Sequence, residues 1–149
     1  MPRRLKISLG RGHAMQVTRI AIGNKKLVYA ILTPKPHRYP WGRSRVVYIG
    51  TTKNGVSRVA QSAASKSDDV LRRLRGVKDF YVRIITCTAR KNVKSWKKLE
   101  RALILVFRKE YGDIPYCNKQ GTGYKWTDEL DYFKETRLKA ILESLEKKL

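Results

Sequence analysis

One acidic side chain, Glu100, interrupts a stretch of largely basic and apolar residues that runs from Lys94 to Phe107. On a helix, its neighbours three and four residues away include Lys97 and Leu103, so it lies at the edge of an apolar stripe. A carboxylate in that position costs free energy unless a partner compensates its charge. The partner is either a lysine such as Lys97 or a divalent cation, because hard cations prefer oxygen ligands.

A second candidate group lies in the stretch VVYIGTTKNGVSR, from Val46 to Arg58. Its apolar beginning predicts a buried strand that ends in Tyr48, Ile49 and Gly50, and a polar turn then leads into a helix. Arg58 lies at the start of that helix, where a guanidinium can bind a phosphate. Taken singly, these residues also fit ordinary roles: a strand tyrosine, a surface cation and a glycine that ends a strand.

The charge balance is strongly basic, with 34 Lys and Arg residues against 12 Asp and Glu residues and a formal net charge of +22. Residues 1–67 contain 14 basic residues and no acid, residues 68–123 have a net charge of +8, and residues 124–149 are balanced. A polyanion would neutralise this field and release counterions, so nucleic acid is the expected partner. An anionic membrane surface is the weaker alternative, because no strongly amphipathic basic helix stands out.

The 149 residues, of which 42% are hydrophobic, fit one domain with a sizeable core. The longest apolar run, from Ala102 to Phe107, is too short to span a bilayer, and the N-terminal residues do not resemble a secretory signal. Cys87 and Cys117 have no metal-ligand spacing and fit buried thiols better than a disulfide. The expected location is therefore the cytoplasm, where the protein would be free or associated with the nucleoid.

The elements that must position these residues form an α+β pattern. Strands are expected at Lys26–Leu32, 46–50 and Asp79–Thr88, with a proline-rich loop at 33–45. Helices are expected at 53–67, 67–76, 93–112 and 127–149, with Gly76 and Gly112 ending two of them. The fold class is thus an α/β or α+β layer with a small, mostly antiparallel three-stranded sheet flanked by helices. A basic N-terminal arm (1–24), which holds the candidate strand Met15–Gly23, precedes a core at 25–123 and a C-terminal helical extension at 124–149.

Taken together and in order, these residues resemble the GIY-YIG nuclease family over roughly residues 26–121. The family's second motif matches Tyr48, Ile49, Gly50, Thr52 and Arg58 with the correct spacing. Leu27, Val28 and Tyr29 fall where the first motif would be. The stretch KLERALILVFRKEYGDIPYCN is similar to the family's glutamate helix and the asparagine after it, here Glu100 and Asn118.

The resemblance implies a role for each residue. Glu100 would hold one divalent metal, Mg²⁺ or alternatively Mn²⁺, against a phosphate oxygen. Arg58 would stabilise charge on the scissile phosphate. Tyr29, helped by Tyr48, would act as general base or orient the water, provided that nearby cations lower its pKa. Gly50 would allow a close backbone approach, and Asn118 would brace the site. Thr52 is a further supporting residue of the motif.

The sequence departs from the family in two places. Leu27 replaces the opening glycine, and Ser62 lies where many members have His or Tyr. Either Tyr29 works alone with the metal, or another group such as Tyr124, His13 or His37 reaches the site. For the two histidines we favour ordinary positions in the arm and the loop.

The 33–45 loop mixes cations with aromatic rings, which suits contact with phosphates and bases, but a rigid proline-rich connection explains it equally well. The residues assigned to nucleic-acid contact in this loop and in the turn beyond the second strand are Arg38, Trp41, Arg43, Arg45 and Lys53.

The sequence therefore predicts a metal-dependent endonuclease that hydrolyses phosphodiester bonds in nucleic acid, with duplex or branched DNA as the favoured substrate. Two alternatives remain: a non-catalytic RNA binder of the ribosomal type, and a decayed nuclease fold that only binds. The C-terminal helix is expected either to pack on the core or to form a homodimer contact.

Overall fold

The computed structural model describes residues 3–12 and 24–148, with the backbone alone at 69–71. The candidate strand Met15–Gly23 and His13 lie outside the described residues. Three strands form one sheet: β1 (Leu27–Tyr39), β2 (Gly42–Thr52) and β3 (Tyr81–Ile85). Their order is β2-β1-β3, and both pairings are antiparallel. The predicted three-stranded antiparallel sheet of an α+β fold is confirmed.

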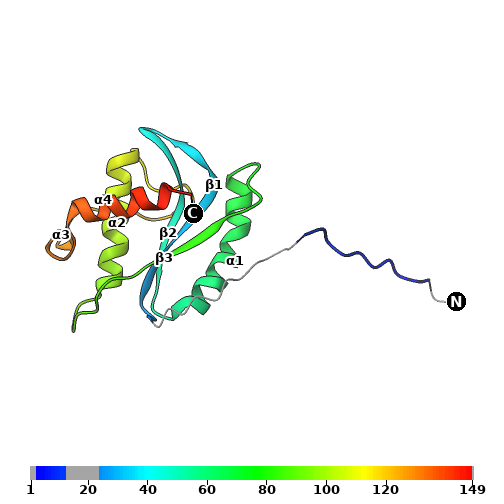
Figure 1. Ribbon diagram of the computed structural model, residues 1–149, viewed down its shortest axis with the longest axis horizontal. Helices are drawn as coiled ribbons and strands as arrows, with labels where there is room; N and C mark the ends of the chain where they lie inside the picture. Colours follow the sequence, from blue (N-terminus) through cyan, green and yellow to red (C-terminus); the bar gives the residue numbers. More distant parts are fainter. Residues whose placement is uncertain (1–2, 13–23, 149) are drawn as a thin grey trace.

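The proline-rich segment is not the loop that the sequence predicted. β1 continues to Tyr39, β2 begins at Gly42, and a two-residue turn joins them into a long hairpin (Figure 1). Pro34 and Pro36 lie between Leu32 and His37, where the register to β2 shifts and β1 has no paired residue. Proline lacks the N–H that a ladder needs, so it is tolerated at this unpaired part of the strand.

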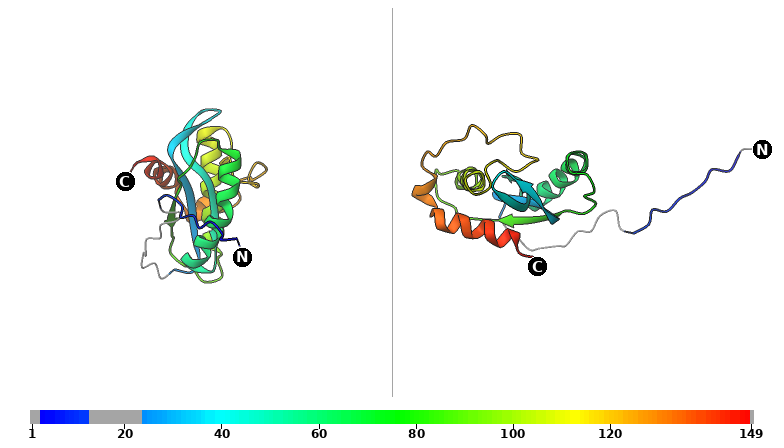
Figure 2. Two further views of the ribbon diagram at one scale, coloured as in Figure 1. Left: turned by 90° about the vertical axis from the view of Figure 1, so that its right-hand side faces the viewer. Right: turned by 90° about the horizontal axis from the view of Figure 1, so that it is seen from above.

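The described residues include four helices: α1 (Gly55–Arg73), α2 (Ser95–Tyr111), α3 (Glu129–Tyr132) and α4 (Glu135–Glu146). α1 covers one face of the sheet, while α2 and α4 cover the other (Figures 1 and 2). The two helices predicted at 53–76 are one helix, since Ser67 does not cap a new one but bonds back to the Ala64 carbonyl at 2.6 Å.

The predicted C-terminal helix is broken. Phe133 and Lys134 adopt extended backbone conformations between α3 and α4, and Leu130, expected on the apolar side, is 46% exposed. α4 nevertheless buries Leu138 and Leu142 in the core that it shares with α2. Residues 124–148 thus contribute to the same core as the sheet, which is the packing alternative foreseen for this segment.

Alternation along β1 explains the two packed layers. Val28, Ala30 and Leu32 pack with residues of α2 and α4. Leu27, Tyr29 and Ile31 belong to a second buried cluster that includes Val59 of α1. Successive side chains of a strand point to opposite faces, so a strand covered on both faces is apolar throughout. Tyr29 is consequently a buried residue on the α1 face.

Gly112 ends α2 as predicted. Its φ is 85°, and its N–H donates to the Arg108 carbonyl at 2.8 Å. A Cβ at this position would lie 2.9 Å from both Pro40 and Trp41 at the tip of the hairpin. A glycine is therefore required twice here, for the left-handed conformation and for the close approach of the hairpin to the helix.

Candidate active site

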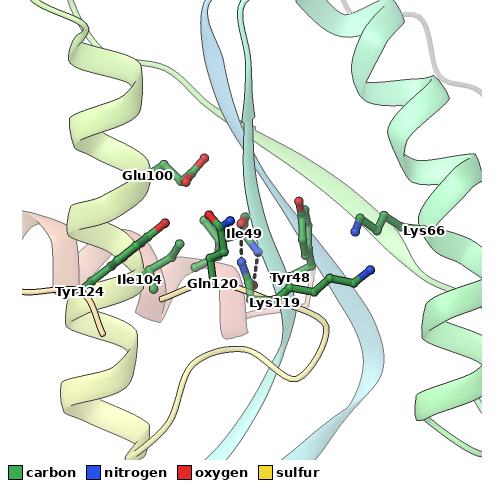
Figure 3. A pocket seen from close by; sticks show the side chains of 9 residues that line it. Tyr48, Ile49, Lys66, Glu100, Ile104, Lys119, Gln120 and Tyr124 are labelled. Carbon is green, nitrogen blue, oxygen red and sulfur yellow. Dashed lines mark hydrogen bonds between the residues drawn. The ribbon is translucent and has the colours of Figure 1, made fainter. Parts of the chain in front are cut away.

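A cavity of about 170 Å³ lies at the outer edge of β2, between α1 and α2 (Figure 3). The segment that follows Cys117 forms its remaining wall. The lining residues come from all four of these parts of the chain: Tyr48, Ile49, Lys66, Glu100, Ile104, Asn118, Lys119, Gln120 and Tyr124. Three of the predicted catalytic and supporting residues, from two elements and a loop, thus meet in one cavity: Tyr48, Glu100 and Asn118.

The two tyrosines of the predicted site are neighbours on one face of the hairpin. Tyr29 lies directly opposite Gly50, so Tyr48 is its diagonal partner. Their ring centroids are 5.8 Å apart. A Cβ on Gly50 would lie 2.5 Å from Tyr48 Cε1 and 2.9 Å from the Tyr29 hydroxyl. The expected close approach at Gly50 is present, and both rings occupy the space that a side chain would need. Tyr29 itself is 3% exposed and does not line the cavity.

A register shift in the hairpin affects where Tyr48 points. Ile31 pairs with Tyr48 and Leu32 pairs with Val46, which leaves Val47 as an extra residue on β2. Such a bulge bends a strand and redirects the side chains beside it. Val47 packs in the α1-side cluster, and Tyr48 packs against the same cluster at the cavity wall.

Glu100 reaches the cavity from α2 with its carboxylate directed toward β2 (Figure 3). Burial raises the pKa of this carboxyl to about 7, although the charges of Lys97 and Arg101 oppose the change. Among the described residues, none makes a hydrogen bond or ion pair with its side chain. The salt bridge to Lys97, one of the two alternatives for this carboxylate, is therefore absent from the described part of the chain, and Lys97 acts only at longer range.

This carboxylate fits one hard cation. Its raised pKa reflects a desolvated charge without a close partner, and a cation would supply that partner. No cluster of three or more His, Cys, Asp or Glu residues exists within residues 3–12 and 24–148. Glu100 would therefore hold the ion alone among protein carboxylates, and Mg²⁺ tolerates this because it keeps several waters.

Tyr48 is poorly suited to act as a base in this environment. Burial is the main reason that its pKa is raised well above the ordinary value of a tyrosine, and the Tyr29 phenol and the Glu100 carboxylate raise it further. A phenol that retains its proton can donate a hydrogen bond but cannot accept a proton from water. The geometry thus favours Tyr48 as a donor that orients a ligand.

Asn118 braces the strand edge, as the sequence predicted. Its Oδ1 accepts a hydrogen bond from the Ile49 N–H at 3.0 Å, and its Nδ2 donates to the Ile49 carbonyl at 2.9 Å. Nearby, the Cys117 N–H donates to the Val47 carbonyl at 2.8 Å. This segment therefore satisfies the outer edge of β2 on both sides of Tyr48, in place of a fourth strand.

Sequence reasoning missed two cations of the cavity, Lys66 and Lys119. The Lys66 ammonium lies 5.0 Å from the centroid of the Tyr48 ring. Lys66 follows Arg58 and Ser62 at intervals of four residues, so the helical repeat could have identified it as a member of the same side of α1. Lys119 lies in a loop, where no periodic signal exists.

Tyr124, one of the alternatives for proton transfer, lines the cavity. The Arg101 guanidinium lies 4.3 Å from the centroid of its ring, and Arg101 also donates to the Lys125 carbonyl at 2.9 Å. Arg101 further pairs with the buried Glu129 at 3.0 Å. Burial alone would raise the pKa of Glu129, but hydrogen bonds from the Thr127 N–H and from Arg101 outweigh it and lower the value to about 2. This ionic contact holds the 124–129 segment against α2.

Arg58 does not line the cavity. Its side chain is exposed, and a guanidinium nitrogen donates to Gln61 Oε1 at 3.1 Å. The predicted convergence of Glu100, a tyrosine hydroxyl and Arg58 is thus only partly present, since Arg58 lies eight residues before Lys66 on α1. Thr52 is buried at the end of β2, where its hydroxyl accepts a hydrogen bond from the Asn54 N–H at 3.1 Å. His37, far along the hairpin, lies near Tyr116 and not at the cavity.

Four of the residues assigned to nucleic-acid contact are exposed: Arg38, Trp41, Arg43 and Lys53. Trp41 lies at the tip of the hairpin and is 70% exposed. Arg45 is different, because it is only 9% exposed and its Nε donates to the Thr33 carbonyl at 2.9 Å. Its backbone N–H donates to Glu146 of α4 at 2.9 Å. The assignment of Arg45 to nucleic-acid contact was wrong, because the expected loop is a strand that packs against α4.

No family model matches this chain, and comparisons with curated proteins and with solved structures found no match. None of the helices within the described residues is long and apolar enough to cross a membrane.

Proposed function

We propose that this protein is a metal-dependent endonuclease of the GIY-YIG type that hydrolyses phosphodiester bonds, with duplex or branched DNA as its substrate. The observation that carries the proposal is that Glu100 and Tyr48 line one cavity while Asn118 braces its wall. These are residues that the family resemblance assigns to the site. The net charge of +22 supports a polyanionic substrate. Because Cys87 and Cys117 form no disulfide within the described residues, we propose a cytoplasmic location.

In this proposal each side chain has a limited task. Glu100 holds a divalent cation, which when bound supplies positive charge to a phosphate oxygen. Tyr48 keeps its proton and donates a hydrogen bond to a phosphate oxygen, while solvent takes the proton of the attacking water and returns one to the leaving oxygen. Lys66 and Lys119 attract the nucleic-acid backbone to the cavity mouth. Tyr29, which is buried and does not line the cavity, supports Tyr48 through its ring and is not the general base.

Arg58 contacts the substrate outside the cavity in this proposal. Because it lies outside the cavity, we propose that it binds a phosphate next to the scissile one, with Arg38 and Arg43 on the hairpin as further contacts. Such contacts set affinity and register and carry no sequence information. Replacing Arg58 by Gln should therefore weaken DNA binding and its salt dependence more than it slows cleavage of bound DNA.

The test is nicking of supercoiled plasmid with Mg²⁺ or Mn²⁺ by the full chain. We expect Glu100→Gln to reduce the rate by at least about 100-fold and Tyr48→Phe by about 10-fold or more. Glu110→Gln is the matched control, since it removes a carboxylate from the same helix away from the cavity, and it should stay within about twofold. Cleavage by Glu100→Gln at the wild-type rate would end the proposal.

A nuclease-like fold that binds nucleic acid without cutting it is the second candidate. The observation in its favour is that Arg58 does not line the cavity to which Glu100 belongs. This candidate predicts salt-dependent binding of DNA or RNA that Glu100→Gln leaves unchanged, with no cleavage of linear, supercoiled or branched substrates in either metal.

A further inference from the structure

A second cavity, which shares no lining residue with the first, lies at the N-terminal end of α2. Its volume is about 460 Å³. The connection from β3 to α2, the first residue of α2 and the segment at the end of α3 form its walls: Cys87, Thr88, Ala89, Arg90, Ser95, Tyr132 and Phe133. The proposed nuclease mechanism uses none of these residues.

Within residues 3–12 and 24–148, the polar groups at this end of α2 have no hydrogen-bond partner. Ser95 is only 8% exposed and lines the cavity, yet its hydroxyl makes no hydrogen bond to any other described residue. Lys94, the residue before the helix, provides no side-chain cap. The first amide of the helix with an acceptor in the described chain is that of Lys97, which donates to the Lys94 carbonyl at 3.1 Å. The N–H groups of Ser95 and Trp96 therefore remain available at the positive end of a 17-residue helix.

The chain on the β3–α2 side of the cavity is basic, and Asp131, next to Tyr132 on the other side, is exposed. Arg90 lines the cavity, and the sequence from Phe80 to Leu99 contains no acid. The nearby carboxylate of Asp128 is already bound by the Lys98 ammonium at 2.7 Å. The hydroxyl of the largely buried Ser95, two helix N–H groups and a guanidinium together match the oxygen atoms of a phosphate.

We propose that this cavity binds a phosphate monoester that carries a nucleoside. Phosphate oxygens would accept hydrogen bonds from the Ser95 hydroxyl, from the first N–H groups of α2 and from the Arg90 guanidinium. The volume exceeds what a phosphate alone needs and lies in the range of small-molecule sites, and Tyr132 and Phe133 supply an aromatic wall for the nucleoside. The ligand is either a free nucleotide or the 5′-phosphorylated end of a strand. This inference does not depend on the nuclease activity.

The test is an NMR titration of the ¹⁵N-labelled full chain in EDTA at about 0.2 M salt, where non-specific binding to so basic a protein is weakened. The probes are AMP, adenosine, inorganic phosphate, and one oligonucleotide with either a 5′-phosphate or a 5′-hydroxyl. We expect the amide signals of Ser95 and Trp96 to shift and saturate with AMP and with the phosphorylated strand. Adenosine should give no shift, and inorganic phosphate should bind more weakly than AMP. Saturation with only one of AMP or the phosphorylated strand would identify the source of the ligand.

Variants distinguish specific binding in the cavity from non-specific attraction to the basic surface. Arg90→Gln should weaken AMP binding by at least about tenfold, and Ser95→Ala by about threefold or more, because each removes a charge-assisted hydrogen bond. Lys91→Gln is the matched control: it removes a charge from the same turn without lining the cavity, and should change affinity by less than about twofold. The proposal would be overturned if Lys91→Gln and Arg90→Gln weakened AMP binding equally, or if AMP caused no saturable shift of the Ser95 amide signal.

Thiol labelling gives an independent readout and a check on folding. Cys87 is half-buried and lines the cavity, whereas Cys117 is 2% exposed. AMP should slow the reaction of Cys87 with an aromatic disulfide reagent in the wild type, and this protection should be lost in Arg90→Gln. Cys117 should stay unreactive in every folded variant. Wild-type labelling of Cys87 that AMP does not slow would contradict the proposal.

Discussion

Replacing Glu100 by Gln should stabilise the ligand-free protein at alkaline pH while it abolishes cleavage. Burial raises the pKa of this carboxyl from 4.5 to about 7 in the folded chain. Below pH 4.5 both the folded and the unfolded chain hold the proton, so the group has no effect on stability. Between 4.5 and 7 the unfolded chain loses its proton first, and the free energy of unfolding falls as pH rises. Above pH 7 the ionised Glu100 lowers the free energy of unfolding by its full amount.

The size of the effect follows from the same two values. At 1.36 kcal/mol per pKa unit, their difference corresponds to about 3 kcal/mol. Glu100 remains partly exposed, so screening by solvent reduces the expected effect to about 2 kcal/mol. Gln has nearly the same shape and no charge, and it should recover that free energy at pH 8 but not at pH 4.

Urea unfolding of the wild type and of Glu100→Gln at pH 4 and pH 8 measures this difference. We expect the midpoint of the variant to exceed that of the wild type by about 1 M at pH 8 and to match it at pH 4. Mg²⁺ should raise the wild-type midpoint at pH 8 and leave the variant unchanged, because only the carboxylate can bind the ion.

Two results would refute this reasoning. If the urea midpoints of the wild type and of Glu100→Gln changed in parallel with pH, the Glu100 carboxyl would not be desolvated. In the wild type, the Glu110 side chain faces solvent and lies 3.6 Å from the Lys139 ammonium. If Glu110→Gln raised the urea midpoint at pH 8 as much as Glu100→Gln does, net charge and not burial would be responsible.

Three further substitutions, two of them paired with a control variant, test the packing of the hairpin and its neighbours. Gly50→Ala should cost about 1–3 kcal/mol of folding free energy, measured by urea unfolding, because its Cβ would overlap two tyrosine rings; Gly123→Ala, which meets no atom within 4 Å, should cost less than about 0.5 kcal/mol. Arg45→Met should lower the free energy of unfolding by about 2 kcal/mol, because it leaves the Thr33 carbonyl without its charged donor. Arg43→Met, at an exposed position, should leave stability unchanged and reduce the salt dependence of DNA binding by about one unit of slope. Asn118→Leu should cost about 2 kcal/mol and reduce cleavage, since both backbone bonds to Ile49 are lost.

These substitutions also have outcomes that would contradict the structure. Equal stabilities of Gly50→Ala and Gly123→Ala would mean that the rings are not packed over the strand. A stable Arg45→Met variant with weakened DNA binding would restore Arg45 to the nucleic-acid surface and contradict its burial under α4.

Local patterns in the sequence predicted much of the fold. Branched and aromatic residues at 27–32 and 46–50 identified two strands, and apolar spacing with a closing Gly112 identified α2. The same spacing located Glu100 at the edge of an apolar stripe. These signals succeed because strand and helix periods act over a few residues, and the two faces of each element are recorded in that short range.

Long-range contacts explain where the predictions failed. Three prolines and a glycine suggested a loop, but the hairpin tolerates Pro34 and Pro36 because no strand pairs with that part of β1. Arg45 looked like a surface cation, but Glu146, 101 residues later, covers it. No local pattern near Val47 predicted that this residue would form the bulge next to Tyr48. Each of these three features depends on a contact with a distant part of the chain, and local periodicity in the sequence does not predict such contacts.

The sequence by itself determined the residue types, the order of the strands and helices along the chain, and the basic charge that calls for a polyanion. Only the tertiary structure decided that Glu100 and Tyr48 share a cavity with Lys66 and Tyr124 while Arg58 remains outside it. The reason is that a cavity forms where elements distant in the sequence meet. Its lining depends on how the helices pack against the sheet, and the pattern within any one helix fixes only the side that a residue occupies.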